Sequence, residues 1–427
     1  MHNEIPKENE PEIKSEDMAA SLSEIEAEYV ASSLIRKSPA VLPAQSNEEV
    51  LQLLAQHTDV VGLPVVEDSK PIGMINRSIF MDEMAKPFRR ELYSRKSCIA
   101  FMDKQPLVVD GRMSIQELSF KVVAAGNKAL KDGFIITAPS GEYAGVGTGE
   151  DLMQVIANLQ AEKNRLVMES INYASVIQKS FLRSARRDLE ASLHDYFIHW
   201  EPRDRVGGDY YFCKKFDDGF FIALIDCTGH GVPGAFMTLI MAAFLDHLLQ
   251  NDNRMDPAGA LSAMNRKVKI ALGQIEEMNI SHLGEAEHSD DGMDTAFCWV
   301  NPSAGKMVYA GAKTPLFLLP KGSDEITIID GDKKGVGYVE TPMDYAWTNK
   351  EVALPEGISV YLTTDGIIDQ IGGPKSIAFG KKRFSKLILE HCSLPMMEQK
   401  GRIMQAFYEY QGSQRRRDDV SLLGFRI

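Results

Sequence analysis

Two aspartates flank a short hairpin signal in the C-terminal half of the sequence. In the stretch VGGDYYFCKKFDDGFFIALIDCTGHGVPGA, two strand-like runs surround Asp217-Asp218-Gly219, which is typical of a turn. Counting outward from this turn places Asp209 opposite Asp226 at the open end of the hairpin. Two facing carboxylates repel each other unless a positive charge lies between them. A divalent cation with oxygen ligands meets this need, so the spacing predicts a metal site.

Two further acidic strand ends lie downstream. The stretch GISVYLTTDGIIDQ alternates apolar residues before it reaches Asp365, and DDVSLLGFRI begins a last apolar strand with Asp418 and Asp419. A strand that ends in Asp and an antiparallel neighbour that begins with Asp place both carboxylates at the same edge of a sheet. Four acids can therefore converge on one cleft. Either acid of the final pair can fill the fourth place.

The segment from residue 196 to 427 resembles the PPM metal-dependent phosphatases, in the bacterial branch related to the sporulation phosphatase SpoIIE and the stress-response phosphatase RsbU. The matching stretches, in the order of the family, are VGGDYY, ALIDCTGHGVPGA, GMDTAF, YAGAKTPL, LTTDGIIDQIGG and DDVSLL. The resemblance implies an α+β fold, in which a PPM-type β-sandwich of two antiparallel sheets is flanked by helices (αββα). It also implies two Mn²⁺ or Mg²⁺ ions at one edge of the sandwich.

The same resemblance implies roles for individual residues. Asp226 would bridge both cations, and Cys227 would contribute its backbone carbonyl. The remaining ligand positions match Asp209, Asp365 and Asp418. Asp294, in GMDTAF, either faces a third metal or caps a strand, and both interpretations stay open. The implied reaction is hydrolysis of a phosphoserine by a water molecule that two cations activate, without a phosphoenzyme.

Several charged residues near these acids have weaker assignments. His230 lies in a Gly-His-Gly turn, where it either protonates the leaving serine oxygen as a catalytic acid or only shapes the turn. Lys313 stands where many relatives carry a histidine, so no role is carried over to it. For Arg415, Arg416 and Arg417, a solvated loop is favoured over a contact with the substrate phosphate.

The elements that must position these residues fall into successive segments. We expect a disordered acidic tail at 1–30, a tandem CBS regulatory module at 31–158, a helical or coiled-coil linker at 159–193 and the phosphatase domain at 194–427. In the module, one pattern appears twice: a short strand, an amphipathic helix, two strands around a turn and a closing helix.

The first helix of each repeat begins with a capping-box signal. These pairs are Ser46 with Glu49 in the first copy and Ser114 with Glu117 in the second.

The two repeats resemble paired CBS domains, a family that often binds adenine nucleotides between its copies. Its ribose-binding pattern fits Gly145, Thr148 and Asp151, whereas the first copy has Asn76 and Ile79 in the corresponding places. A carboxylate accepts both ribose hydroxyl hydrogens and an isoleucine cannot. The resemblance therefore implies at most one adenine-nucleotide site, at Thr148 and Asp151. A CBS pair that only dimerises is the alternative.

No proline or glycine interrupts a helical pattern from Asp151 to about Leu189. Apolar residues recur at spacings near three, four and seven, which favours a long helix that pairs with its copy in a homodimer. A helix that lies on its own domain is the alternative.

Composition restricts the partners and the compartment. A formal charge of -13, with no basic stripe, argues against nucleic acid. The N-terminus has no signal-peptide pattern, and the apolar stretch from Ala235 to Leu249 is expected to be too short to cross a bilayer. Five scattered cysteines fit reduced thiols. We therefore expect a cytoplasmic protein without membrane association.

By the resemblance, the substrate is a phosphorylated STAS-type anti-sigma factor antagonist in a bacterial partner-switching pathway. The CBS module would regulate the phosphatase. The alternative is a catalytically silent, nucleotide-sensing scaffold that binds a partner through the phosphatase fold. All four expected metal-binding aspartates are present, which favours the enzyme.

Overall fold

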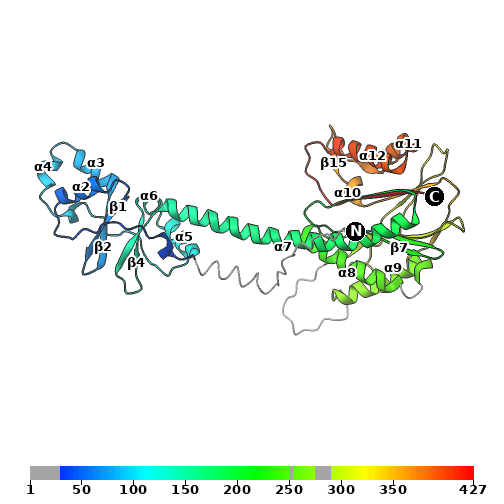
Figure 1. Ribbon diagram of the computed structural model, residues 1–427, viewed down its shortest axis with the longest axis horizontal. Coiled ribbons are helices and arrows are strands. Elements are labelled where there is room, and N and C mark those ends of the chain that lie inside the picture. Colours follow the sequence, from blue (N-terminus) through cyan, green and yellow to red (C-terminus); the bar gives the residue numbers. More distant parts are fainter. Residues whose placement is uncertain (1–28, 250–252, 275–289) are drawn as a thin grey trace, which may run out of the picture. The chain divides into compact units, whose positions relative to one another are not determined.

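The computed structural model describes residues 29–249, 253–274 and 290–427. The chain forms two compact units, Met1–Met168 and Glu169–Ile427 (Figure 1). The boundary between them falls within helix α7 (Gly149–Ser192), so this one helix contributes residues to both units. The predicted tail at 1–30 lies outside the described residues except for its last two.

The N-terminal unit is built from two similar halves. The first contains a two-stranded antiparallel sheet, and the second contains a three-stranded sheet in the order β3-β4-β5. The first half comprises α2 (Asn47–Gln56), β1 (Gly62–Glu67), β2 (Lys70–Asn76), α3 (Arg77–Ala85), α4 (Arg89–Tyr93) and η2 (Cys98–Phe101), whereas the N-terminal turn η1 (Ala31–Leu34) packs into the core of the second half. The second half comprises β3 (Val108–Asp110), α5 (Ile115–Ala124), α6 (Asn127–Asp132), β4 (Phe134–Thr137), β5 (Tyr143–Gly147) and the start of α7.

The two predicted capping boxes differ in the structure. At α2, the Ser46 side chain accepts from the Glu49 backbone and the Glu49 side chain accepts from the Ser46 backbone, which confirms the first box. At α5, the Ser114 side chain accepts from the Glu117 backbone at 3.2 Å. The Glu117 carboxylate lies 3.2 Å from Lys121 Nζ instead. The second box is therefore formed in one direction only, because Glu117 pairs with the next turn of the helix.

The short strand predicted at the start of the first repeat is reduced to one bridge. Val41 pairs in parallel with Val65 through two backbone hydrogen bonds of 2.9 Å. Pro39 and Pro43 lie two residues away on either side. Proline has no backbone N–H to donate, so the ladder cannot extend past them.

The C-terminal unit is a sandwich of two five-stranded antiparallel sheets. Their strand orders are β13-β10-β9-β8-β7 and β12-β11-β14-β17-β6. The first sheet contains β7 (Asp209–Phe216), β8 (Gly219–Cys227), β9 (Met293–Asn301), β10 (Lys306–Ala312) and β13 (Lys350–Ala353). The second contains β6 (Asp195–Glu201), β11 (Leu316–Leu319), β12 (Thr327–Ile329), β14 (Ser359–Thr363) and β17 (Val420–Arg426).

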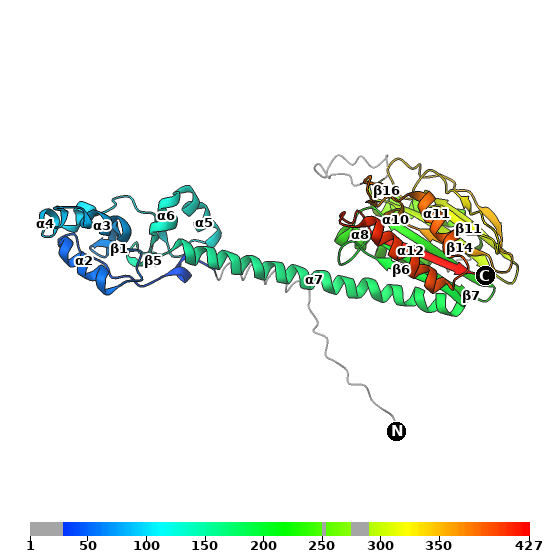
Figure 2. The ribbon, with the colours of Figure 1, turned by 90° about the horizontal axis from the view of Figure 1, so that it is seen from above.

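Helices cover the outer face of each sheet and complete the predicted αββα fold. Helices α8 (Gly231–Leu249) and α9 (Pro257–Ala271) lie on one side of the sandwich (Figure 1). Helices α11 (Gly380–His391) and α12 (Met396–Gln411) lie over the second sheet (Figure 2). The short elements η3 (Asn253–Met255), α10 (Asp365–Ile368), β15 (Ile371–Gly372) and β16 (Ile377–Ala378) complete the unit.

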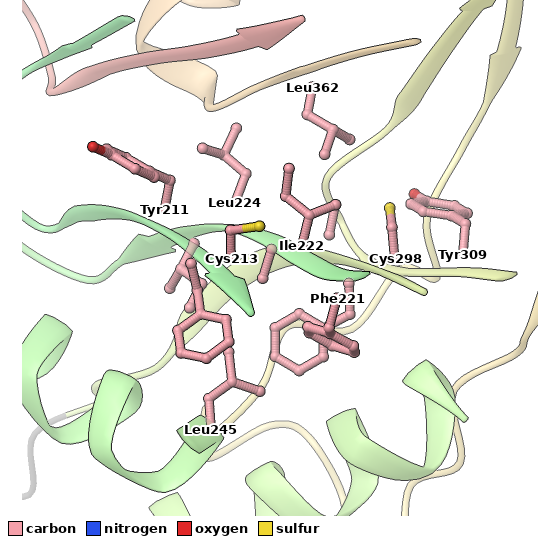
Figure 3. Close-up of a cluster of buried hydrophobic side chains, with 14 of the residues drawn as sticks. Tyr211, Cys213, Phe221, Ile222, Leu224, Leu245, Cys298, Tyr309 and Leu362 are labelled. Carbon is pink, nitrogen blue, oxygen red and sulfur yellow. The ribbon is translucent and has the colours of Figure 1, made fainter. Parts of the chain in front are cut away.

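Strand β8 lies at the centre of the core, and this position explains why its sequence is continuously apolar. Residues Phe220 to Ile225 are all buried. Alternate side chains meet different layers: Ile222 and Leu224 point toward Leu362 of the second sheet, whereas Phe221 points toward Leu245 of α8 (Figure 3). A strand covered on both faces needs apolar residues at every position, as this one has.

Helix α8 is a core helix of this unit. It begins at Gly231, so its 19 residues make it longer than the apolar stretch predicted from the sequence. By length and composition alone it could cross a membrane, which corrects the expectation that it is too short; half of that apolar window is buried inside the unit. Buried residues such as Met241 and Leu245 belong to the same hydrophobic core as the first sheet.

The cysteine side chains are unpaired. Cys98, Cys213, Cys227 and Cys298 are buried, and Cys392, just after α11, is partly accessible. Burial raises the pKa of each of the four buried thiols. These thiols are therefore poor nucleophiles near neutral pH, in line with a reaction that needs no phosphoenzyme.

Candidate metal centre and catalytic cleft

Three carboxylates line up across neighbouring strands at one edge of the first sheet. The hairpin register pairs Asp209 of β7 with Asp226 of β8, as counted from the turn in the sequence. On its other side, Asp226 pairs with Asp294 of β9. Paired residues of antiparallel strands project from the same face, so the three acids share one face of the sheet. Such a row of like charges is destabilising unless protons or cations neutralise it.

Two more carboxylates come from the second sheet. Asp365 begins α10 two residues after the end of β14, and Asp418 lies two residues before the start of β17. Strands β14 and β17 are antiparallel, with Thr363 opposite Leu422, so both acids lie at the same end of the pair. The charges of Asp209, Asp365, Asp418 and Asp294 all raise the pKa of Asp226.

Asp209 is the most deeply buried acid of this group, with an exposed fraction of 1%. Its Oδ2 accepts a hydrogen bond of 2.8 Å from Thr364 Oγ1, and its Oδ1 has no hydrogen-bond partner among the described residues. Burial, with the charge of Asp419 next, raises the pKa of Asp209 well above its ordinary value. An unpartnered buried carboxylate oxygen beside other carboxylates fits a hard divalent cation.

The other two acids of the centre differ in exposure. Asp226 is half-buried, and burial followed by the charge of Asp209 raises its pKa well above the usual value. Asp365 is solvent-exposed at the rim of the cleft, yet desolvation and the charge of Asp418 raise its pKa to about 6. The centre thus holds more negative charge than its surroundings offset.

The two neighbouring acids Asp418 and Asp419 make different contacts. Both oxygens of Asp419 accept backbone hydrogen bonds of 2.6 Å, from Arg203 N–H and Gly208 N–H, and the side chain is buried. Asp418 is half-buried, and its Oδ1 accepts from the Asp419 backbone at 2.9 Å. Asp419 therefore fixes the segment that leads into β7.

The acids are neighbours across the two sheets and do not form a closed cage. Within residues 29–249, 253–274 and 290–427, no three His, Cys, Asp or Glu side chains are grouped closely enough to hold one ion as they stand. A cleft of about 170 Å³ lies beside them. Its lining includes Asp226, Asp294, Lys313, Thr364, Asp365 and Lys381.

Comparison with known proteins shows the family. The SpoIIE family, stage II sporulation protein E, matches residues 217–427, and the CBS domain family matches residues 30–86. The solved SiaA-PP2C domain of Pseudomonas aeruginosa is similar at 34% identity and a TM-score of 0.53, over 62% of this chain and 99% of that domain. This chain belongs to the PPM family. It is a serine/threonine phosphatase of the PP2C type with an N-terminal CBS domain.

Other solved structures share less with the phosphatase. The RsbU and RsbW domains of Rv1364c from Mycobacterium tuberculosis match at 18% identity and a TM-score of 0.43, over 55% of this chain and 60% of that one. The PP2C domain and regulatory fragment of SpoIIE from Bacillus subtilis match at 16% identity and a TM-score of 0.42, over 55% of this chain and 64% of that one. A search of curated proteins gave no match.

His230 lies outside the lining of the cleft. The turn that follows β8 directs its Nδ1 to Asp204 Oδ2, at 2.9 Å, and both side chains are exposed. Cys227, next to Asp226, donates its backbone N–H to Gly208 O at 3.0 Å. Asp226 therefore lines the cleft, whereas His230 lies beside Asp204 in the loop before β7.

Two lysines line the cleft, and the sequence analysis assigned no role to either of them. Lys313 Nζ lies 3.4 Å from Asp294 Oδ1 and 4.4 Å from the centre of the Tyr338 ring, and its φ is +59°. Lys381, at the start of α11, lies 3.0 Å from Asp330. Lys313 was noticed in the sequence because many relatives carry a histidine at its position, but this difference indicated no role. The stretch FGKKRF contains no pattern that would have indicated a functional role for Lys381.

The three arginines before the final strand have structural contacts. Arg416 pairs with Glu201 at 3.1 Å and lies 5.3 Å from the centre of the Phe407 ring. The charge of Arg417 lowers the pKa of Asp365, and the Arg415 carbonyl accepts from Gln370. Arg416 is therefore part of a surface network instead of a free loop.

In the N-terminal unit, the predicted ribose-binding residues lie together but are already engaged. Thr148 Oγ1 donates to Asp151 Oδ2 at 2.9 Å. Arg36 approaches both oxygens of Asp151 at 2.6 Å, in a bidentate pair. The cavity lined by Arg36 and Thr148 is only about 30 Å³, whereas the cavity beside Asn76 and Ile79 is about 570 Å³.

Proposed function

We propose that this phosphatase removes the phosphate from a phosphoserine of a regulatory protein, a STAS-type anti-sigma factor antagonist in a partner-switching pathway. The observation that supports hydrolysis is the row of Asp209, Asp226 and Asp294 beside Asp365 and Asp418 at the cleft. The sequence resemblance to SpoIIE and RsbU supports the substrate class. The proposed location is the cytoplasm.

The residues fit a pair of divalent cations, Mn²⁺ or Mg²⁺. We assign the ligands to Asp209, Asp226, the Cys227 carbonyl, Asp365 and Asp418. Asp418 is chosen over Asp419 because backbone donors occupy both oxygens of Asp419. When bound, such cations make water nucleophilic near neutral pH and offset the negative charge of a phosphate.

The chain's own residues orient the substrate and the ligands. Thr364 holds Asp209 through its hydroxyl, and Asp419 holds the loop before it. Lys313 and Lys381 line the cleft and attract the phosphate dianion. We propose His230 as the proton donor to the serine oxygen, which requires its turn to move from Asp204 toward the substrate.

The CBS module and α7 would regulate this activity. Exposed apolar side chains on α7, including Met153, Ile156, Val167 and Val176, support pairing with a second copy in a homodimer. An adenine nucleotide at Thr148 and Asp151 would have to displace Arg36 from the carboxylate. Light scattering of the purified chain measures the dimer, and Val167→Asp should shift it toward monomer.

The decisive experiment compares the protein with Asp226→Asn. With Mn²⁺ and an aryl phosphate, the unsubstituted protein should turn over, and the variant should lose at least about 100-fold in activity, beyond the usual effect of a residue that only orients a ligand. No turnover with any divalent metal, with or without adenine nucleotides, would favour the alternative of a silent nucleotide-sensing scaffold. Phosphoproteomics of a strain that lacks the protein would identify the substrate.

A further inference from the structure

Two short basic segments form one surface beside the catalytic cleft. Residues 370–383 and 411–417 contain lysine and arginine but no aspartate or glutamate, although the whole chain has a formal net charge of -13. We call these two segments together the basic rim. Its basic residues are Lys375, Lys381, Lys382, Arg383, Arg415, Arg416 and Arg417.

Hydrogen bonds join the two segments of the rim. Gln370 is fully buried; its Nε2 donates to Arg415 O at 3.1 Å, and its Oε1 accepts from Arg417 N–H at 3.2 Å. Gly373 N–H donates to Tyr410 O at 2.8 Å, which holds the hairpin of β15 and β16 against the end of α12. The positive charges therefore lie on one connected part of the unit, although the segments are separated in the sequence.

The basic rim begins where the acidic lining of the cleft ends. Asp365 and Asp369 line the cleft, and Lys381 of the rim lines it as well. In the other segment, Arg417 directly precedes Asp418. Side chains that flank a phosphoserine in the cleft would therefore pass close to the rim.

Most charges of the rim have no carboxylate partner. Arg416 pairs with Glu201 at 3.1 Å, and Lys381 pairs with Asp330 at 3.0 Å. Within residues 29–249, 253–274 and 290–427, the other basic side chains of the rim form no ion pair. Such positive charge attracts an acidic partner and increases the rate of association. These side chains are all exposed to solvent: Lys375, Lys382, Arg383, Arg415 and Arg417.

A polypeptide fits this surface better than a nucleic acid does. Ile377, between Lys375 and Lys381 in the sequence, has an exposed fraction of 46%, so the rim offers an apolar contact beside its charges. Protein interfaces combine apolar and charged contacts in this way. Nucleic acids bind mainly through many phosphate contacts, and a chain with a net charge of -13 repels a long polyanion.

We propose that the basic rim is a docking surface for acidic residues that flank the phosphoserine of the protein substrate. The inference rests on the proposed function and adds what the phosphatase recognises outside the phosphate group. The rim acts through charge at exposed positions, so its effect belongs to substrate binding and weakens as salt screens the charges.

The test uses two short phosphoserine peptides as defined substrates. They differ only in the residues on both sides of the phosphoserine, which are glutamates in one peptide and glutamines in the other. With the full chain and Mn²⁺ at about 0.02 M NaCl, kcat/KM should be about 10-fold higher for the glutamate peptide, mainly through a lower KM. This preference should largely disappear at about 0.5 M NaCl.

The variant for this test neutralises three exposed charges of the rim at once. It carries Lys375→Gln, Lys382→Gln and Arg415→Gln, and none of these side chains forms an ion pair among the described residues. The variant should dephosphorylate both peptides with the kcat/KM that the unsubstituted protein has for the glutamine peptide. Its hydrolysis of an aryl phosphate should stay unchanged, because that substrate has no flanking residues.

A matched control changes the net charge by the same amount outside the rim. It carries Lys306→Gln, Lys321→Gln and Arg266→Gln, which are also exposed positions of the phosphatase unit. This control should keep the preference for the glutamate peptide. An equal loss in the control would overturn the inference, because the net charge of the chain and not the rim would then explain the preference.

The remaining outcomes separate the inference from the proposed function. If neither the aryl phosphate nor the peptides are hydrolysed, the proposed function fails. If the aryl phosphate is hydrolysed and the preference between the peptides is absent, only the inference fails. A single-stranded oligonucleotide that inhibits more strongly than the glutamate peptide without its phosphate would assign the rim to nucleic acid and would also overturn the inference.

Discussion

At the scale of single residues, the acidic centre should make the metal-free phosphatase sensitive to pH. Burial and the neighbouring carboxylates raise the pKa of Asp365 to about 6, and they also raise the pKa values of Asp209 and Asp226 well above the ordinary value. A raised carboxyl pKa favours the folded state while the group is protonated, so this stability is complete below the ordinary pKa of about 4 and is lost as the pH rises through 6 and above. In EDTA, the urea midpoint should therefore fall from pH 5 to pH 8.

Excess Mn²⁺ should remove this decline, because bound cations replace the protons as partners of the carboxylates. The comparison needs only urea unfolding at several pH values with and without metal. A midpoint that is flat with pH in EDTA would contradict the charge states derived from the structure.

The role of His230 can be tested with two substrates that differ in their leaving group. If its imidazole protonates the serine oxygen, His230→Ala should lower kcat on a phosphoserine protein by about 10²- to 10⁴-fold. An aryl oxide leaves without such help, so hydrolysis of an aryl phosphate should fall far less. Asp204→Asn removes the charge beside Nδ1 and provides the control. Equal losses on both substrates would mean that the histidine only shapes its turn.

Sequence reasoning predicted the residues of the centre that depend on local spacing. The pairing of Asp209 with Asp226 followed from counting outward from a hairpin turn. The contacts of Asp419 with Arg203 and Gly208 could not be predicted in the same way, because they join residues more than 200 positions apart. Lys381 was missed for the same reason, since α11 reaches the cleft only in the folded unit.

At the scale of elements, the close packing of the segment before β7 predicts a strong effect of one methyl group. A Cβ on Gly208 would lie 2.5 Å from Gly229 O and 2.7 Å from Cys227 O. Both are backbone atoms that cannot rotate away, so Gly208→Ala should destabilise the phosphatase by about 1–3 kcal/mol. Urea unfolding of the metal-free protein measures this difference.

Gly401 provides the matched control for that substitution. It lies inside α12, and a Cβ there would meet nothing within 4 Å. Gly401→Ala should therefore stabilise the protein by about 0.5–1 kcal/mol, the usual gain for alanine over glycine within a helix. A loss of stability at both glycines would show that general intolerance, and not the crowded loop, explains the result at Gly208.

Periodicity explains which elements could be predicted. The continuous apolar run of β8 and the uninterrupted pattern of α7 indicated a buried strand and a long helix, and both are present. The strand expected at Val41 is a single bridge because of its flanking prolines. The box at Ser114 is incomplete because Glu117 has a competing partner, Lys121. Such competition between contacts is visible only in three dimensions.

At the scale of the whole molecule, the engagement of Asp151 predicts how the CBS module responds to nucleotide. Arg36→Ala should free this carboxylate for a ribose and increase the affinity for an adenine nucleotide, measured by calorimetry with AMP, ADP and ATP in turn. Arg90→Ala is the control, because it breaks the exposed pair with Glu48 without touching Asp151.

No increase for Arg36→Ala with any of the three nucleotides would contradict a ribose site at Thr148 and Asp151. The CBS domain at residues 30–86, the long helix α7 and the SpoIIE match at residues 217–427 follow one another in the order that the sequence patterns indicated. The engagement of Asp151 by Arg36 could not be predicted, since the two residues lie 115 positions apart.

The distribution of thiols has a practical consequence for spectroscopy. Four cysteines are sealed in the interior, while Cys392 at the end of α11 is within reach of solvent. A maleimide dye or nitroxide should therefore attach at one defined position on the native sequence. Cys392 is thus a natural labelling site in the helical layer that covers the second sheet, and no other cysteine has to be removed first.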